Sequence, residues 1–227
     1  MSYVFSPPAQ PSVEVKGRSE RFPVHRIYCV GRNYAAHARE MGFDPDRETP
    51  FFFTKPADAI VPNNATIPYP SRTNNLHHEI ELVVAIGKGG KNIAIDAALG
   101  HVYGYAVGND LTRRDLQFAA RDKGRPWDTG KAFDRSAVIT AIRPATEGHI
   151  EKGRIWLKVN GETKQQSDVT HLIWNVREVI AELSTLFELA PGDLIYTGTP
   201  EGVGAIKSGD RLEGGIDGLD TLVTTIA

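Results

Sequence analysis

The sequence nearly lacks cysteine. Its 227 residues include one, Cys29, so no intramolecular disulfide can form. A chain of this size without disulfides is typical of a reducing cytoplasm. Cys29 lies in the apolar run from Ile27 to Val30, where a cysteine is usually a small buried apolar side chain rather than a nucleophile. We therefore interpret it as a core residue.

Long apolar runs and an excess of basic charge are also missing. No segment approaches the roughly 20 apolar residues of a membrane helix, and the opening MSYVFSPPAQPSVEVKG lacks the apolar stretch of a signal peptide. The formal net charge is −2, whereas binding of nucleic-acid phosphates requires a basic face. With this net charge, only a local basic patch could bind a nucleic acid. We expect a cytoplasmic protein that acts on small molecules, with neither a nucleic acid nor a membrane as partner.

Short apolar segments separated by Gly, Pro, Asn and Asp dominate the chain. They predict strands over residues 26–30, 51–54, 79–86, 102–109, 137–142, 154–159 and 194–197. Asn160-Gly161 directly follows one of these segments and predicts a tight hairpin turn, because both residues tolerate positive φ.

Helical periodicity is less common. It predicts short helices over residues 33–41, closed by Gly42, and 115–121, and a longer one over 174–187 with apolar residues at helical spacing. The sequence therefore predicts a β-rich α+β fold. We expect an extended arm over residues 1–24, where proline is frequent, and a single domain over residues 25–227.

The segment from His78 to Ile86 carries two glutamates within an apolar strand. Because side chains alternate faces along a strand, Glu79 and Glu81 share one face, and both faces are apolar further along. Two buried like charges require partners, and a divalent cation such as Mg²⁺, Mn²⁺ or Ca²⁺ would supply one. The alternative is a strand that begins in solvent with both glutamates hydrated, and the local pattern alone favours that alternative.

A third carboxylate strengthens the metal interpretation. Asp110 ends the second buried strand, where it is well placed to join a site on a neighbouring strand. Its alternative role is to cap the helix that follows. His77 shares the glutamate face, but one histidine supplies less nitrogen than zinc prefers.

These residues resemble the fumarylacetoacetate hydrolase family. The resemblance extends from Ile27 to the C-terminus, and its blocks occur in the family's order: VGRNY at 30–34, Lys55-Pro56, HEIE at 78–81, GYAVGND at 104–110, KAFD at 131–134 and GTPEGVG at 198–204. It implies a β-sandwich roll with a few short peripheral helices, usually a homodimer. It also implies Mg²⁺ or Mn²⁺ held by Glu79, Glu81 and Asp110.

The resemblance further assigns roles to residues outside the carboxylate group. His37 and Glu40 match a pair that activates water, on a short helix that the family places in a mobile lid; without the family, we would read them as a solvated helix face. Lys131 matches a lysine of the site, Arg114 and Gln117 match contacts to the substrate carboxylate and oxo group, and Thr199 lies in a loop whose N–H groups could bind carboxylate.

The implied reaction is metal-dependent hydrolysis of a carbon–carbon bond in a small dicarboxylic diketone. The opening MSYVFSPP and the segment 49–56 are most similar to family members that convert fumarylpyruvate to fumarate and pyruvate in gentisate breakdown. An acylpyruvase or oxaloacetate decarboxylase of the same family is the alternative enzyme. A catalytically silent metal-binding β protein is the alternative without activity.

Overall fold

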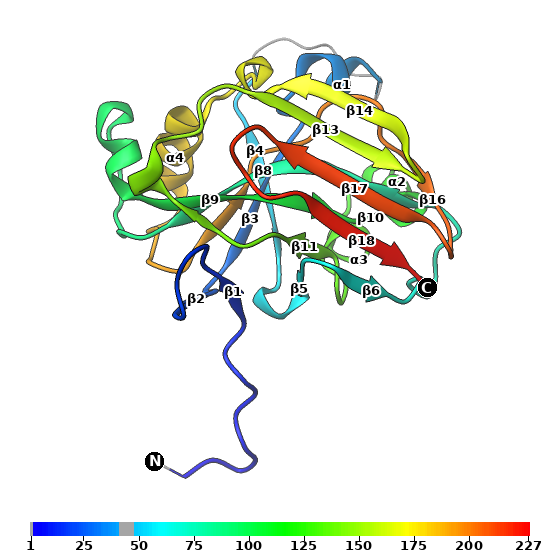
Figure 1. The fold of residues 1–227 in the computed structure, drawn as a ribbon, viewed down its shortest axis with the longest axis horizontal. Coiled ribbons are helices and arrows are strands. Elements are labelled where there is room, and N and C mark those ends of the chain that lie inside the picture. The colour runs from blue at the N-terminus through cyan, green and yellow to red at the C-terminus, as the bar shows by residue number, and fades with distance from the viewer. Residues whose placement is uncertain (1, 41–47) are drawn as a thin grey trace.

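An eight-stranded mixed sheet lies at the centre of the molecule (Figure 1). The computed structural model describes residues 2–40 and 48–227. In spatial order the sheet contains β4 (Phe51–Lys55), β3 (Ile27–Gly31), β15 (Leu194–Tyr196), β8 (Ile80–Ile86), β9 (Val102–Asp110), β11 (Ala137–Ile139) and β5 (Ile60–Pro62), with β12 (Arg143–Pro144) paired to β9. β8 and β9 are interior strands, so both of their edges are paired with neighbouring strands.

A second, five-stranded sheet packs against the central one (Figure 1). Its order is β14 (Glu162–Asp168), β13 (Arg154–Val159), β17 (Arg211–Ile216), β18 (Leu222–Ile226) and β6 (Ala65–Ile67). Two small sheets complete the strands: β10 (Thr112–Arg113), β7 (Leu76–His78) and β16 (Gly204–Ile206) form one, and β1 (Ser12–Glu14) and β2 (Arg21–Pro23) form the other.

The helices are short and peripheral. They are α1 (Ala35–Glu40), α2 (Arg114–Arg121), α3 (Asp128–Lys131) and α4 (Val176–Leu186), together with 3₁₀ turns at Ala57–Ala59, Ile95–His101, Ala145–Glu147 and Val169–His171. In the part of the chain that the structure describes, no helix is long and apolar enough to cross a membrane. The architecture confirms the expected β-rich α+β fold, a mixed sandwich roll with a few short outer helices.

Two apolar cores lie on opposite faces of the central sheet. Ile80, Leu82 and Val84 of β8 face the core that contains the second sheet and α4. Val83 and Ala85 face the other core, beside the N-terminal hairpin. Every residue of β8 is buried, so the prediction of a strand covered on both faces is confirmed.

The antiparallel pairing of β8 and β9 positions the acidic residues. Glu81 lies opposite Gly108, and two positions further along the Asp110 N–H donates to the Glu79 carbonyl at 2.8 Å. The predicted strand over 79–86 begins one residue later, because Glu79 is the junction at which the chain leaves β7 of a small sheet and enters β8. Glu79 and Asp110 therefore stand side by side where two sheets meet.

Most other predicted elements are present with small shifts. Asn160 and Gly161 adopt φ of 52° and 84° and join β13 to β14 as the expected two-residue turn. The strand expected over 137–142 ends at Ile139, because Ile142 pairs instead with the N-terminal hairpin through its N–H to Glu14. The helix expected over 33–41 is α1, and its predicted end at Met41 and Gly42 lies outside the described residues.

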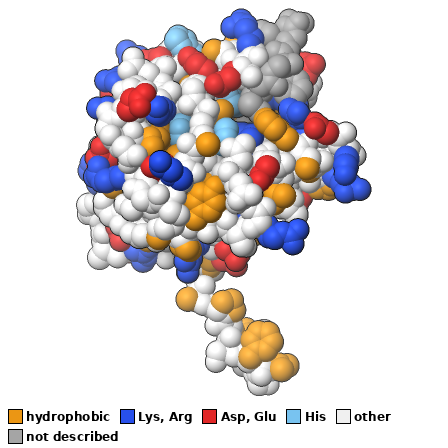
Figure 2. Space-filling model, turned by 90° about the vertical axis from the view of Figure 1, so that its right-hand side faces the viewer, with side chains coloured by type: hydrophobic (Ala, Val, Ile, Leu, Met, Phe, Trp, Pro, Cys, Tyr) orange, Lys and Arg blue, Asp and Glu red, His pale blue; other side chains and the backbone are white. Residues whose placement is uncertain are grey.

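The N-terminal 24 residues have two parts. The β1–β2 hairpin buries Val13, Phe22 and Val24 against the central sheet. The residues before it run away from the body as an extended arm that carries apolar side chains (Figures 1 and 2), and among these Tyr3, Val4 and Phe5 are exposed.

Gly108 is required by this packing, and we expect Gly108→Ala to destabilise the fold. A Cβ at this position would lie 2.5 Å from Tyr196 and from Val83, and both side chains are fully buried. Overpacking of this kind costs about 1–3 kcal/mol, which urea unfolding would measure. Gly100→Ala is the matched control, because its Cβ would meet no atom within 4 Å. Equal unfolding free energies for the two variants would contradict the proposed role of Gly108.

Candidate active site

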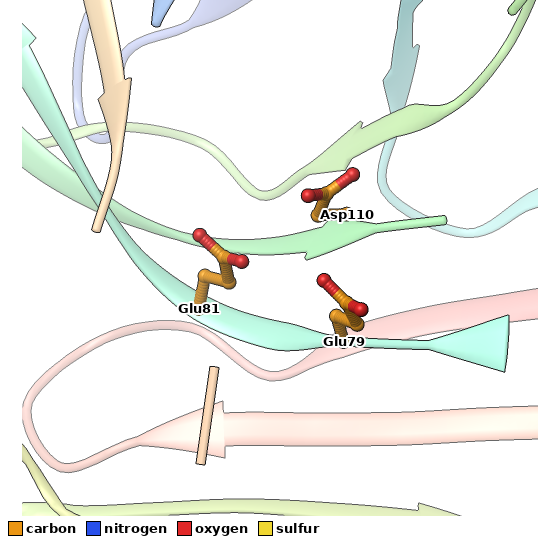
Figure 3. A group of neighbouring side chains, drawn as sticks. All are labelled: Glu79, Glu81 and Asp110. Atoms are coloured by element: carbon orange, nitrogen blue, oxygen red, sulfur yellow. The ribbon is translucent and has the colours of Figure 1, made fainter. Parts of the chain in front are cut away.

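Three carboxylates converge at one end of the β8–β9 pair. Figure 3 shows Glu81 on β8, Glu79 just before that strand and Asp110 at the end of the neighbouring β9, with their carboxylates turned toward one another. One oxygen from each lies within 4.8 Å of the others, and the residues are 4%, 2% and 0% exposed. The structure thus brings Asp110, from the end of the neighbouring strand, to the two glutamates that strand alternation placed on one face. Their burial excludes the alternative in which the glutamates are hydrated.

Two lysines and an arginine surround Glu79 and Asp110. The Lys131 Nζ lies 2.6 Å from Glu79 Oε2 and 2.7 Å from Asp110 Oδ2, and Lys55 Nζ lies 2.7 Å from Asp110 Oδ1. Arg114 pairs with the other oxygen of Glu79. Asp110 is therefore engaged with cations and does not cap α2, whose N-cap is Arg113 without a side-chain bond.

Glu81 has a different environment. It accepts a hydrogen bond from the Gly198 N–H at 2.8 Å, and among residues 2–40 and 48–227 no lysine or arginine forms an ion pair with it. Burial, followed by the neighbouring Asp110 and Glu79 charges, raises the pKa of Glu81 well above its usual value. Burial also raises the pKa of Glu79, but Lys131 and Arg114 outweigh it and lower that pKa overall.

This donor set fits a divalent cation. A carboxylate that burial and like charges push toward neutrality is stabilised as an anion when a cation lies between the three oxygens. Oxygen-only ligands suit Mg²⁺ and Mn²⁺ and disfavour zinc. His77 Nδ1 lies 3.4 Å from Arg114 Nε, and this contact disfavours a role for His77 as a metal ligand. Burial, then Arg114, lowers the pKa of His77 to about 4.

The predicted pair on α1 faces the same site. His37 Nδ1 lies 3.2 Å from Glu40 Oε2, and His37 is buried rather than on a solvated helix face. Glu40 also accepts from the Gly202 N–H at 3.1 Å, which fixes the carboxylate from the opposite side. Burial alone would raise the pKa of Glu40, but the hydrogen bonds from His37 and Gly202 lower it, so Glu40 is ionised at neutral pH.

A cavity of about 480 Å³ joins these groups. Eight of the nine site residues named from the sequence line it, and the ninth, Glu40, reaches it through His37. The eight are His37, Glu79, Glu81, Asp110, Arg114, Gln117, Lys131 and Thr199. Arg114 Nη1 donates to Gln117 Oε1 at 2.6 Å, so these two side chains form one polar wall.

Several residues of the site were missed by the sequence analysis. Lys55 ends the apolar strand β4, and it was noted only as part of a family block. Gln165 comes from the second sheet and donates to Thr199 Oγ1 at 2.8 Å. The remaining cavity walls include Arg32 and Arg121 beside the rings of Phe53, Phe118 and Trp127. Nothing in the local sequence signals that these separate segments meet.

Comparison with known proteins places the chain in a family. The family model described as fumarylacetoacetate (FAA) hydrolase C-terminal matches residues 26–227, and the chain belongs to that family. A fumarylpyruvate hydrolase from Ralstonia sp. is 54% identical over 183 residues, which span 81% of this chain and 95% of that protein. The human mitochondrial oxaloacetate tautomerase FAHD1 is 42% identical over 194 residues, spanning 85% and 87%.

The fold has the same relatives. A crystal structure of fumarylpyruvate hydrolase from Pseudomonas aeruginosa, in complex with Mn²⁺ and pyruvate, superposes with a TM-score of 0.98 at 56% identity and covers 100% of this chain and 99% of its own. The family resemblance noted from the sequence blocks is therefore confirmed.

The carboxylate group predicts the effect of Glu81→Gln on metal binding. Even loss of an outer hydrogen bond to a ligand typically weakens metal affinity 10- to 100-fold, so loss of the charge that faces the other two carboxylates should weaken Mn²⁺ binding by at least about tenfold. Paramagnetic relaxation of water during a Mn²⁺ titration measures this affinity. Glu162→Gln, at an exposed carboxylate, is the control. Unchanged affinity in Glu81→Gln would remove this residue from the metal site.

Proposed function

We propose that this chain is a metal-dependent hydrolase that cleaves the carbon–carbon bond of fumarylpyruvate and releases fumarate and pyruvate. The observation that carries the proposal is one cavity in which a buried three-carboxylate group lies beside a hydrogen-bonded His–Glu pair. The 54% and 56% identities to fumarylpyruvate hydrolases over most of the chain support the substrate.

Glu79, Glu81 and Asp110 would hold Mg²⁺ or Mn²⁺, with Ca²⁺ as a further candidate for an all-oxygen site. When bound, this ion supplies Lewis-acid stabilisation of negative charge on oxygen, which is worth several kcal/mol in such sites. Arg114, Gln117 and Thr199 line the same end of the cavity and would orient the pyruvoyl carboxylate and oxo group.

His37 is the proposed general base. Its ring is fixed by Glu40, which the Gly202 N–H in turn holds, so that the other ring nitrogen is left for a water molecule. After His37 takes the proton, the hydroxide adds to the fumaroyl carbonyl. The bond between that carbon and the neighbouring CH₂ group then breaks, and the electron pair leaves with the pyruvate fragment as its enolate. Protonation of the CH₂ carbon gives pyruvate.

Lys131 is the proposed electrostatic partner of this step. Burial tends to lower its pKa, but Asp110 and Glu79 outweigh that effect and raise it, so the ammonium stays protonated. A fixed cation in the cavity wall would stabilise either the oxyanion formed at the fumaroyl carbon or a substrate carboxylate.

Of the alternative enzymes, an oxaloacetate decarboxylase forms an enolate without water, whereas an acylpyruvase hydrolyses its substrate. Relatives named oxaloacetate tautomerase are 42% identical and share most of the chain, so an acylpyruvase or oxaloacetate decarboxylase activity is the second candidate. The His37–Glu40 pair favours hydrolysis, because decarboxylation requires no hydroxide. A silent metal-binding protein would need neither this pair nor the cavity.

The setting of the enzyme is part of the same proposal. We place it in the cytoplasm, as a homodimer, in gentisate breakdown. The solitary buried thiol of Cys29 suits a reducing compartment, and the exposed apolar arm suits association with a second copy.

The substrate assignment predicts equimolar fumarate and pyruvate from fumarylpyruvate with Mg²⁺ present, observed by proton NMR. A steady-state panel should include maleylpyruvate, fumarylacetoacetate, acetylpyruvate and oxaloacetate. We expect fumarylpyruvate to have the highest kcat/KM, because the site offers both a hydroxide-forming pair and several cations for a dianion. Far more efficient turnover of oxaloacetate would promote the second candidate.

The His–Glu pair predicts a separation of hydrolysis from binding. His37→Ala should lose hydrolytic kcat by about 10²–10⁴-fold, as expected for a general base, and should keep its affinity for Mg²⁺ and for oxalate, a mimic of pyruvate enolate. Glu40→Gln should lose less, since the imidazole remains but its orientation weakens. Calorimetry with Mg²⁺ and oxalate provides the binding control. If His37→Ala hydrolyses at nearly the original rate, the base must lie elsewhere.

A further inference from the structure

The guanidinium groups of Arg32 and Arg121 lie at the mouth of the active-site cavity. The inner cavity opens into an outer groove with about 1110 Å³ of empty volume. Arg32, Phe53, Arg121, Trp127 and Lys131 line both spaces, so they mark the point where the two join. None of the roles in the proposed mechanism uses the two arginines.

Helix α2 connects the inner end of the cavity to this mouth. Arg114 begins the helix and Arg121 ends it, and residues seven apart lie on the same face about 10 Å apart along the axis. Arg114 reaches inward to Glu79, whereas Arg121 lies at the outer end over the ring of Phe118, 4.4 Å from its centre. The helix therefore places one arginine at each end of the cavity.

Arg32 approaches the mouth from the other side. It follows β3 in a left-handed conformation with φ of 55°, and its guanidinium lies 5.1 Å from the centre of the Phe51 ring. Burial lowers the pKa of Arg32. The negative charge of Glu48 raises this pKa, and the positive charge of Arg121 lowers it. The exposed partner of Arg121 is Asp122, and an ion pair of this kind contributes little. Two cations that face one cavity favour an anion between them.

The walls between the two ends are aromatic and apolar. The rings of Phe53 and Trp127 lie 5.7 Å apart at an interplanar angle of 58°, and Phe51 contacts Trp127 edge-on at 5.2 Å. A flat unsaturated chain packs well against such rings, whereas a bare carboxylate there would be desolvated without a donor. An occupant that matches both features is an elongated molecule with an anion at each end and a planar apolar middle.

We propose that Arg32 and Arg121 bind the distal carboxylate of the substrate's acyl group, with Phe53 and Trp127 against its unsaturated chain. This inference rests on the proposed hydrolase function and extends it: the enzyme selects dicarboxylic acylpyruvates with a trans double bond. Acetylpyruvate has no distal carboxylate for the arginine pair to bind. Maleylpyruvate, with its bent cis double bond, would direct its distal carboxylate away from the mouth.

Arg121→Gln and Arg32→Gln test the proposal through substrate selection. The ratio of kcat/KM for fumarylpyruvate to that for acetylpyruvate should fall about 10- to 100-fold in each variant, mainly through the KM for fumarylpyruvate, because a charge-assisted hydrogen-bond pair is lost. Arg121→Lys, which keeps the charge without the bidentate fork, should recover part of the ratio. Arg113→Gln is the matched control: its side chain lies over Phe133 and lines neither space.

Fumarate binding supplies a readout that does not depend on turnover. Its inhibition constant or calorimetric affinity should weaken in Arg121→Gln and stay the same in Arg113→Gln. An unchanged substrate ratio, or an equal loss on fumarylpyruvate and acetylpyruvate, would overturn the proposal, since either result removes the arginines from distal recognition. Failure of the unmodified enzyme to hydrolyse fumarylpyruvate would overturn the hydrolase function instead, and the fumarate measurement would still decide the role of the arginines.

Discussion

The burial of three carboxylates in one pocket is the constraint on which the rest of the site depends. Each charge that is taken from water without a partner is strongly unfavourable. The partners of these carboxylates are Lys55 from β4, Lys131 from α3 and Arg114 from α2, so three separate elements must converge on β8 and β9. These cations serve Glu79 and Asp110, and Glu81 is left as the carboxylate that a divalent ion would stabilise. Structural stability and metal binding therefore use the same electrostatic network.

The layered fold buries one side of this pocket. Second-sheet residues press close to the central sheet near the acidic group, where a Cβ on Gly214 would overlap Ile80. Gln165 of the same sheet bonds both His78 and Thr199, which ties the inner end of the cavity to the second layer. Water is thereby excluded from one side of the carboxylates, and access is through the mouth lined by aromatic rings. A low local dielectric strengthens every charge interaction in the site.

The sequence predicted those parts of the fold that local periodicity determines. Alternation along β8 correctly placed Glu79 and Glu81 on one face, and the Asn160-Gly161 signal correctly placed a hairpin. It did not predict β17, in which Gly214 allows close packing against Ile80 of the central sheet. It also missed Lys55 and Arg32, because their roles depend on contacts with residues far away in the chain. A buried lysine has the same local signature as an exposed one until its partners are known.

The loop from Gly198 to Gly202 links the proposed catalytic pair to the proposed metal ligands. Its first N–H donates to Glu81, and its last donates to Glu40. Both glycines adopt positive φ, of 100° and 87°, and a Cβ would overlap Asn33 at one and the Lys164 carbonyl at the other. The loop is therefore fixed by the backbone conformation of two residues and by neighbouring strands. Because this short segment bonds Glu40 at one end and the proposed metal ligand Glu81 at the other, it would set the distance from the proposed base His37 to the metal site.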